Sequence, residues 1–532
     1  GEFFIPFLLN EGIGTTSLSL IVTSEGFADV TVEYPVGTTI GTWSVTPDDE
    51  AIIPIPAGAS IGWPLWSYAG SPSQPPLSDN VASHAVRVTA TFDVAVVARN
   101  SEPGTKDKAL ALPTDLLGTE YYVLAERPGG TPTFGAGAHF VVVATEDDTT
   151  VTVDGITTGL APVILDRGEG VAIQSYYGVA GTHVVADKKV AVANGNRCTQ
   201  FPVAGGRYCS HLYEISLPVE RWENEYLAST TGNVSGLTYG GRDVLSQETY
   251  LVVAAQDATS LSVNGVYHGM LDAGDTWELD SFYDADDFAH IEADKPIFGV
   301  QFMNSLCYEF PGDPGCTNIA NSLAVGSASM ANLIPLGRFP RLTRFQGAEV
   351  YNIVVPTADA ASGGVFIDGV AINPGAFDPF PSVPSWSVFS GTLGFPSQLH
   401  TLESPAGHGA WLINAGFGTG STAPLGYDYD VPHGQQTCSG SVAYDSGIPG
   451  FHYAVGEGFG IAVRFTPPSY PWTISQAEFW PWSSTDGLAF EVHVWDDNGA
   501  GGMPGADLIT PFVHTATTTD DWDLVSLPSI TI

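Results

Sequence analysis

Few residues in this sequence could perform chemistry, and the one catalytic pattern present lacks its context. Residues 58–62 read GASIG, which matches the GxSxG pattern of a serine nucleophile. That pattern requires a strand before the serine and a helix after it, whereas WPLW follows at residues 63–66. The sequence contains no HExxH, P-loop or dinucleotide-binding motif. We therefore predict that the protein is not an enzyme, with a secreted hydrolase of unknown class as the remote alternative.

Oxygen ligands for a cation gather near residue 500. Asp496, Asp497 and Asn498 lie on a Gly-rich turn, and Asp507 follows downstream. Carboxylate and amide oxygens suit Ca²⁺, although the spacing is not that of an EF-hand. A turn that satisfies its own backbone with Asx side chains is the competing interpretation. Calcium is the one cofactor that the sequence suggests.

Tryptophans beside prolines form a second candidate site. Such rings could stack against sugars, or they could fill the ends of β-sandwiches. The glycan-contact candidates are Trp63, Trp66, Trp480 and Trp482.

The cysteines predict two disulfides. Cys198 and Cys209 bracket one short Gly/Pro-rich loop, and Cys307 and Cys316 bracket another. A disulfide across such a loop contributes about 3 kcal/mol. A metal site is the rival interpretation, but neither loop has CxxC spacing. Disulfides imply an oxidising compartment, and Cys438 is left as a buried thiol or as a link to another chain.

Four histidines recur at equivalent places, each at the start of a predicted strand: His84, His183, His290 and His400. They suggest a metal site. However, each stands in a different repeat, so they can converge on one ion only if the repeats are arranged radially. A structural role at the start of each strand is the favoured interpretation.

The elements that must position these residues are predicted to be β-strands. Gly and Pro punctuate short runs rich in Val, Thr and aromatic residues, which is typical of an all-β fold. Strand pairs recur at about one hundred residues, as in HVVADKKVAVANGN at 183–196 and HIEADKPIFGVQFMN at 290–304. We predict four β-sandwich-like repeats, with a propeller-like arrangement of the four as the alternative. The predicted boundaries are 1–105, 106–212, 213–328 and 329–420, then a linker at 421–437 and a separate, incomplete sandwich at 438–532.

Tight hairpins are predicted within three repeats. Asx-Gly dipeptides favour type I′ turns, because both turn residues take positive φ. They occur after alternating strands, at Asp154-Gly155, Asn264-Gly265 and Asp368-Gly369.

Several motifs together resemble a known family. ALPTDLLGTEYYV at 111–123, the hairpin VVVATEDDTTVTVDG and CSHLYEISLPVERW at 209–222 resemble the amino-terminal domain of the IgG-Fc-binding protein family, which also occurs in bacterial secreted proteins. The resemblance covers about residues 1–420. It implies an extracellular module of adhesive or surface proteins, with no catalytic residues to carry over. The last hundred residues resemble, more distantly, β-sandwich modules of secreted bacterial proteins.

The formal net charge of −41 arises from 58 acidic residues against only 17 Lys and Arg. Such a surface repels phosphate backbones, so nucleic acid is not an expected partner. The sequence contains no run of eighteen apolar residues, so it predicts no helix that spans a membrane. We expect an extracellular or cell-surface protein, a subunit of a fibre, sheath or matrix that self-associates through strand edges or binds other surface proteins. A cell-surface adhesin or glycan-binding protein is the alternative.

Overall fold

Short antiparallel strands make up most of the regular structure. The computed structural model describes residues 1–10, 16–24, 26–47, 49–61, 81–102, 105–125, 138–155, 161–175, 178–199, 210–229, 238–239, 242–243, 248–280, 288–303, 328–345, 350–392, 399–416, 419–424, 473–479, 489–494, 506–515 and 523–531. The chain divides into two compact units, Gly1–Val431 and Pro432–Ile532. Within the described residues, none of the helices is long and apolar enough to cross a membrane. The predicted all-β class is confirmed.

The first sandwich of the N-terminal unit defines a pattern that the unit then repeats. Its first sheet has the strand order β1 (Glu2–Ile5), β7 (Val86–Ala90), β3 (Ala28–Glu33) and β4 (Thr39–Val45). Its second sheet has the order β5 (Ala51–Ile55), β2 (Ser17–Ser24), β8 (Val94–Glu102) and β9 (Thr105–Leu110). A turn at residues 91–93 separates β7 from β8, so the chain passes there from one sheet to the other.

The second and third sandwiches keep this order but fuse the strands equivalent to β7 and β8 into one long strand. In the second, β15 (His183–Thr199) pairs with β10 (Gly118–Tyr122), β12 (Thr149–Asp154), β11 (Ala138–Ala144) and β16 (Ser210–Ile215). The outer strands are β13 (Val163–Leu165) and β14 (Gly170–Ser175), with β6 (Val81–Ala82) added beside β14. In the third, β24 (Phe288–Met303) pairs with β17 (Glu223–Ser229), β21 (Thr259–Val263), β20 (Glu248–Ala254) and β25 (Ser329–Asn332). Its outer strands are β22 (Val266–Leu271) and β23 (Thr276–Asp280).

The fourth sandwich returns to separate strands. One sheet has the order β26 (Leu342–Phe345), β32 (His400–Glu403), β28 (Phe366–Ile367) and β29 (Val370–Ala371). The other has β30 (Asp378–Pro379), β31 (Trp386–Thr392), β27 (Val350–Pro356), β33 (Gly409–Gly416) and β34 (Thr419–Pro424). Short elements lie between strands: the hairpin β18 (Thr238–Tyr239) and β19 (Arg242–Asp243), the helices α1 (Gly58–Ile61) and α3 (Thr357–Ser362), and the 3₁₀ turns η2 (Thr114–Leu116), η3 (Val219–Arg221), η6 (Leu336–Arg338) and η7 (Pro374–Ala376).

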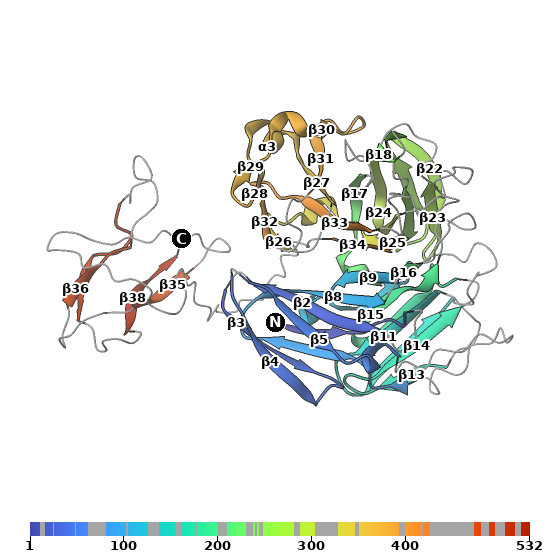
Figure 1. Ribbon diagram of the computed structural model, residues 1–532, viewed down its shortest axis with the longest axis horizontal. Helices are drawn as coiled ribbons and strands as arrows, with labels where there is room; N and C mark the ends of the chain where they lie inside the picture. Colours follow the sequence, from blue (N-terminus) through green and yellow to red (C-terminus); the bar gives the residue numbers. More distant parts are fainter. Residues whose placement is uncertain are drawn as a thin grey trace. The chain divides into compact units, whose positions relative to one another are not determined.

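The last strands of the four sandwiches meet one another in a closed circuit. β9 lies against β16, β16 against β25, β25 against β34, and β34 against β9. Figure 1 shows these four strands in the middle of the unit, between the first two sandwiches and the last two. The repeats are therefore sandwiches, as the favoured prediction had it, and they are arranged radially, as the propeller-like alternative proposed. The repeat boundaries themselves stay predictions.

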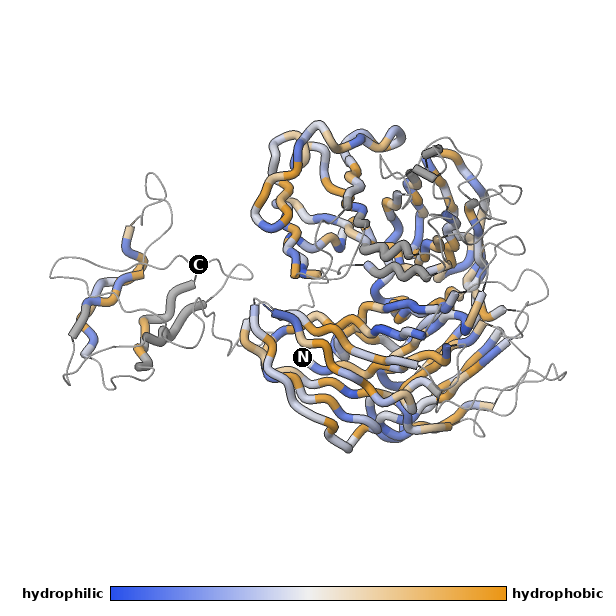
Figure 2. The backbone as a smooth tube through the Cα atoms, viewed as in Figure 1, coloured by the Kyte–Doolittle hydropathy of each residue, from blue (hydrophilic) through white to orange (hydrophobic). Residues whose placement is uncertain are grey.

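Alternating burial explains why these sequences form half-buried strands. β12 reads TTVTVD with Val151 and Val153 buried between polar neighbours, and β21 reads TSLSV with the same alternation. Figure 2 shows hydrophobic and hydrophilic positions alternating along many strands. Each Val, Leu, Ile or Phe side chain that is fully buried contributes about 1.5–3 kcal/mol. One apolar cluster includes side chains from the first three sandwiches, which ties their cores together.

Two of the three predicted hairpins are confirmed. Asn264 and Gly265 have φ of 50° and 75°, and Asp368 and Gly369 have φ of 51° and 72°, which are the positive values of a type I′ turn. The prediction is wrong at residues 154–155, where only the glycine has a positive φ, of 102°. There β12 pairs with β13, whose first residue is Val163, so the connection is longer than two residues.

A buried tyrosine supports the start of the second and third sandwiches in the same way. The Tyr121 hydroxyl donates to the Val190 carbonyl at 2.6 Å, and the Tyr226 hydroxyl donates to the Ile297 carbonyl at 2.7 Å. We expect Tyr121→Phe to lower the free energy of unfolding by about 1–2 kcal/mol, because a buried carbonyl loses its donor. Chemical denaturation of wild type and variant measures this. An equal unfolding midpoint would contradict the role assigned to the hydroxyl.

The C-terminal unit has two described strand pairs. β35 (Thr473–Phe479) pairs with β38 (Asp523–Thr531), and β36 (Ala489–Val492) pairs with β37 (Phe512–Thr515). Val492, Ile509, Val525 and Leu527 form a small buried cluster. The predicted incomplete sandwich stays a prediction.

Candidate functional site

The serine of the GxSxG pattern has a structural role. Ser60 lies in α1 and is fully buried. Its hydroxyl donates to the Leu8 carbonyl at 2.5 Å and so holds the chain segment that follows β1. A buried hydroxyl committed to the main chain is not placed as an exposed nucleophile.

Most of the other predicted site residues lie outside the described residues. The glycan, disulfide and calcium predictions that rest on them stay predictions: Trp63, Trp66, Trp480, Trp482, Cys209, Cys307, Cys316, Asp496, Asp497 and Asn498. Cys198 is buried at the end of β15 and is disulfide-bonded, while its predicted partner is not described. Asp507 is exposed, and its Oδ1 lies 3.0 Å from Nδ1 of His493.

The four recurrent histidines each contact a partner within their own sandwich. The Tyr34 hydroxyl lies 3.0 Å from Nδ1 of His84, and burial lowers the pKa of this imidazole. His183 Nε2 lies 2.8 Å from Glu120 Oε1, and His400 Nδ1 lies 2.8 Å from Asp368 Oδ2. His183 and Glu120 lie on the neighbouring strands β15 and β10, and the other two pairs lie at strand ends or in a turn, which agrees with a structural role at each strand start.

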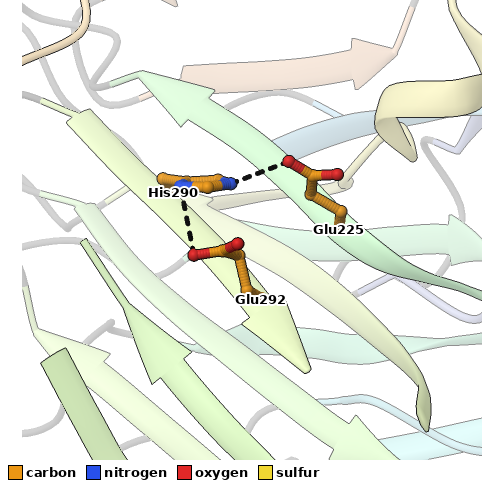
Figure 3. Close-up of side chains that lie close together, drawn as sticks. All are labelled: Glu225, His290 and Glu292. Atoms are coloured by element: carbon orange, nitrogen blue, oxygen red, sulfur yellow. Dashed lines mark hydrogen bonds and ion pairs between the residues drawn. The ribbon is translucent and has the colours of Figure 1, made fainter. Parts of the chain in front are cut away.

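The remaining histidine, His290 of the third sandwich, contacts two carboxylates. His290 Nε2 lies 2.9 Å from Glu225 Oε1, and its Nδ1 lies 3.4 Å from Glu292 Oε2. Figure 3 shows the imidazole between the two carboxylates, which come from β17 and β24. One ligand atom from each residue lies within 4.8 Å of the others. The sequence indicated His290 as a candidate ligand but did not indicate the two carboxylates. No motif links Glu225 to His290, and the register of β17 against β24 brings them together.

Two buried carboxylates lie where the last strands of the sandwiches, β9, β16, β25 and β34, meet in a closed ring. Asp107 on β9 accepts hydrogen bonds from the backbone N–H of Tyr213 on β16, at 3.1 Å, and of Met330 on β25, at 3.3 Å. Its other oxygen accepts from the Lys108 N–H at 3.0 Å. Inner edges of β-strands carry backbone N–H groups that are costly to bury without acceptors. Asp107 supplies these acceptors, and one side chain thereby joins three sandwiches.

Glu214 joins the second and third sandwiches in the same way. Its carboxylate accepts from the Asn332 N–H at 3.4 Å, the Asn332 amide at 3.3 Å and the Ile215 N–H at 3.3 Å. Burial raises the pKa of Glu214 well above its usual value, and the negative charge of Asp107 raises it further. Hydrogen bonds from Asn332 and Ile215 oppose this shift only in part. The centre of the ring is thus an electrostatically costly, closed polar cluster.

The strand that ends the first sheet of each sandwich contains no Lys, Arg, Asp or Glu, and is called uncharged below in that sense. These strands read TIGTWSV in β4, VIL in β13, VYHGML in β22 and VA in β29. In β22, Val266 and Tyr267 are each 59% exposed and Met270 is 54% exposed. Within the described part of the chain, β22 pairs with β21 alone. Soluble proteins usually protect such an edge with charged residues, so an uncharged open edge is a candidate interaction site.

Fold and sites together define a class of protein: a ring of four β-sandwiches, joined by carboxylates at the centre and carrying uncharged sheet edges. The chain belongs to the IgGFc binding protein family, whose family model matches residues 107–413. It is also similar to the IgGFc-binding protein of Homo sapiens, with 26% identity over 431 residues. That alignment covers 76% of this chain but 7% of the human protein, so the chain spans a small part of its relative's length. The predicted resemblance is confirmed.

Proposed function

We propose that the chain is a non-enzymatic extracellular structural protein that self-associates through the open edge of its third sandwich. The observation that carries this proposal is strand β22, which contains no Lys, Arg, Asp or Glu and has Val266, Tyr267 and Met270 exposed. An unpaired edge of this kind is a template for strand addition by a neighbouring chain. The disulfide at Cys198 supports an oxidising compartment.

Net charge sets the conditions under which copies would associate. A charge of −41 makes two copies repel each other at long range. Salt screens that repulsion, since the Debye length falls from about 30 Å at 0.01 M to about 8 Å at 0.15 M. We therefore expect self-association to strengthen as salt is added, and sedimentation velocity across this range measures it.

A double substitution on the edge tests the site. Val266→Lys with Met270→Lys places charges along β22, and we expect it to weaken self-association by at least about tenfold, or about 1.4 kcal/mol. Val185→Lys is the matched control. Val185 is 39% exposed, but it lies on β15 between two paired strands, β10 and β12, and so not at an open edge. A wild type that stays monomeric at every salt concentration would overturn the proposal, as would equal losses in the edge and control variants.

Binding of a different protein is the second candidate, and the family supports it. The human relative is named for IgG Fc binding. Immunoglobulin Fc is therefore a suitable first partner to test with the same variants. The adhesin and glycan-binding alternative rests on tryptophans outside the described residues and is tested by glycan-array binding.

A further inference from the structure

We propose that Glu225, His290 and Glu292 bind a divalent transition-metal ion, with Zn²⁺ as the representative, on strands β17 and β24 of the third sandwich. This site is independent of the open edge and of the proposed self-association. Its ligands are one imidazole nitrogen and two carboxylates, a set that zinc accepts in proteins.

Strand register brings the three side chains to one face. Glu225 on β17 is directly opposite Glu292 on β24, and His290 pairs with Leu227, two residues along. Side chains two residues apart on a strand point to the same face. His290 is 6% exposed, and both glutamates are partly exposed, so the imidazole is fixed while the carboxylates reach solvent. Figure 3 shows this arrangement.

The charges of the site call for a cation. Like charges directly opposite each other on neighbouring strands are destabilising, and Glu225 faces Glu292 in this way. Among the described residues, no lysine or arginine forms an ion pair with either carboxylate. A metal ion bound between the two carboxylates would offset their repulsion.

The equivalent place in the second sandwich lacks this feature. Glu120 corresponds to Glu225 and His183 to His290, but Val185 stands opposite Glu120 where the third sandwich has Glu292. The His183 ring stacks on Tyr122 with 4.3 Å between ring centroids and 9° between planes. In the third sandwich Leu227 takes the place of that tyrosine. The third sandwich thus replaces an aromatic neighbour and a valine with an aliphatic residue and a second carboxylate.

The donor set selects the type of ion. An imidazole nitrogen suits Zn²⁺ and other transition metals, whereas Ca²⁺ takes oxygen ligands. With bonds of about 2.1 Å, ligand atoms around a tetrahedral ion lie about 3.4 Å apart. The three ligand atoms lie within 4.8 Å of one another. The partly exposed glutamates would therefore move inward, and water would complete the coordination.

Isothermal titration of the full chain with ZnCl₂ tests the proposal. We expect one zinc ion per chain at this site, and Glu292→Val, which copies the second sandwich, should weaken that binding by at least about tenfold. The control Glu120→Gln changes the equivalent glutamate of the second sandwich and should leave zinc binding unchanged. Circular dichroism confirms that each variant is folded.

The reverse substitution gives an independent readout. Val185→Glu places a carboxylate opposite Glu120 and should add a second zinc site, raising the stoichiometry from one to two. Failure of the wild type to bind Zn²⁺, or equal binding by wild type and Glu292→Val, would overturn the proposal. In either case the contacts of His290 with the two carboxylates have a structural role alone.

Discussion

Asp107→Ala is expected to lower the free energy of unfolding of the N-terminal unit by about 3–5 kcal/mol. The substitution leaves the N–H groups of Tyr213 and Met330 without the carboxylate that now accepts from them. Each buried donor without a partner costs about 1–3 kcal/mol. Relief from burying the charge offsets part of this loss, but the interfaces of β9 with β16 and β25 lose a shared acceptor.

Denaturation monitored by tryptophan fluorescence measures the loss, and hydrogen exchange locates it. We expect the amides of Tyr213 and Met330 to exchange faster in the variant. Asp187→Ala is the matched control, because Asp187 also accepts from a strand N–H, that of Thr150 at 2.8 Å, but is exposed to water. Equal effects of the two substitutions, or a loss below about 1 kcal/mol for Asp107→Ala, would contradict a central role for Asp107.

Stability is expected to fall with rising pH through the ionisation of Glu214. The folded-state pKa of Glu214 is raised above its ordinary value of 4.5, so the folded protein binds this proton more tightly than the unfolded chain does. The contribution is therefore present in acid and is lost as pH rises from about 4.5 to the raised pKa. Its slope is at most about 1.4 kcal/mol per pH unit.

Glu214→Gln isolates this effect, because the amide cannot ionise. The difference in unfolding free energy between the two proteins should change in favour of the variant as pH rises from 5 to 8, by at most about 1.4 kcal/mol per pH unit. Taking the difference cancels other titrating groups, among them Glu50, whose pKa burial and Asp49 raise to about 7, and Lys108, whose pKa burial lowers to about 8. A difference that is constant with pH would show that Glu214 is ionised throughout.

Local features of the fold could be predicted from the sequence, because they depend on neighbouring residues. The turns at Asn264-Gly265 and Asp368-Gly369 follow from backbone preferences of two residues. The same dipeptide failed at Asp154-Gly155, where the following strand pairs at a greater distance along the chain. The alternation of polar and apolar residues before Asp154 likewise matches the burial of Val151 and Val153 in β12.

The central site could not be predicted, because its contacts depend on how four sandwiches meet. Asp107 is separated from Tyr213 by 106 residues and from Met330 by 223 residues. A Leu-Pro or Ile-Pro pair follows each of the strands β9, β16 and β25. Asp107 lies five residues before the leucine of its pair, and the residues at the same place in the second and third sandwiches are Leu212 and Ser329. No repeated pattern therefore marks the carboxylate, and only the closed circuit of strands brings its partners to it.

Closure of the ring also requires contacts between residues that are far apart in the sequence. The first sandwich is complete in sequence by residue 110, at the end of β9, yet β9 makes its contact with β34 only once residues 419–424 are present. Contacts between residues so distant in sequence form slowly. Until then the side of β9 that meets β34 lies at an unfinished surface that can pair with another chain. We therefore expect the N-terminal unit to be open to misassembly until β34 has been synthesised.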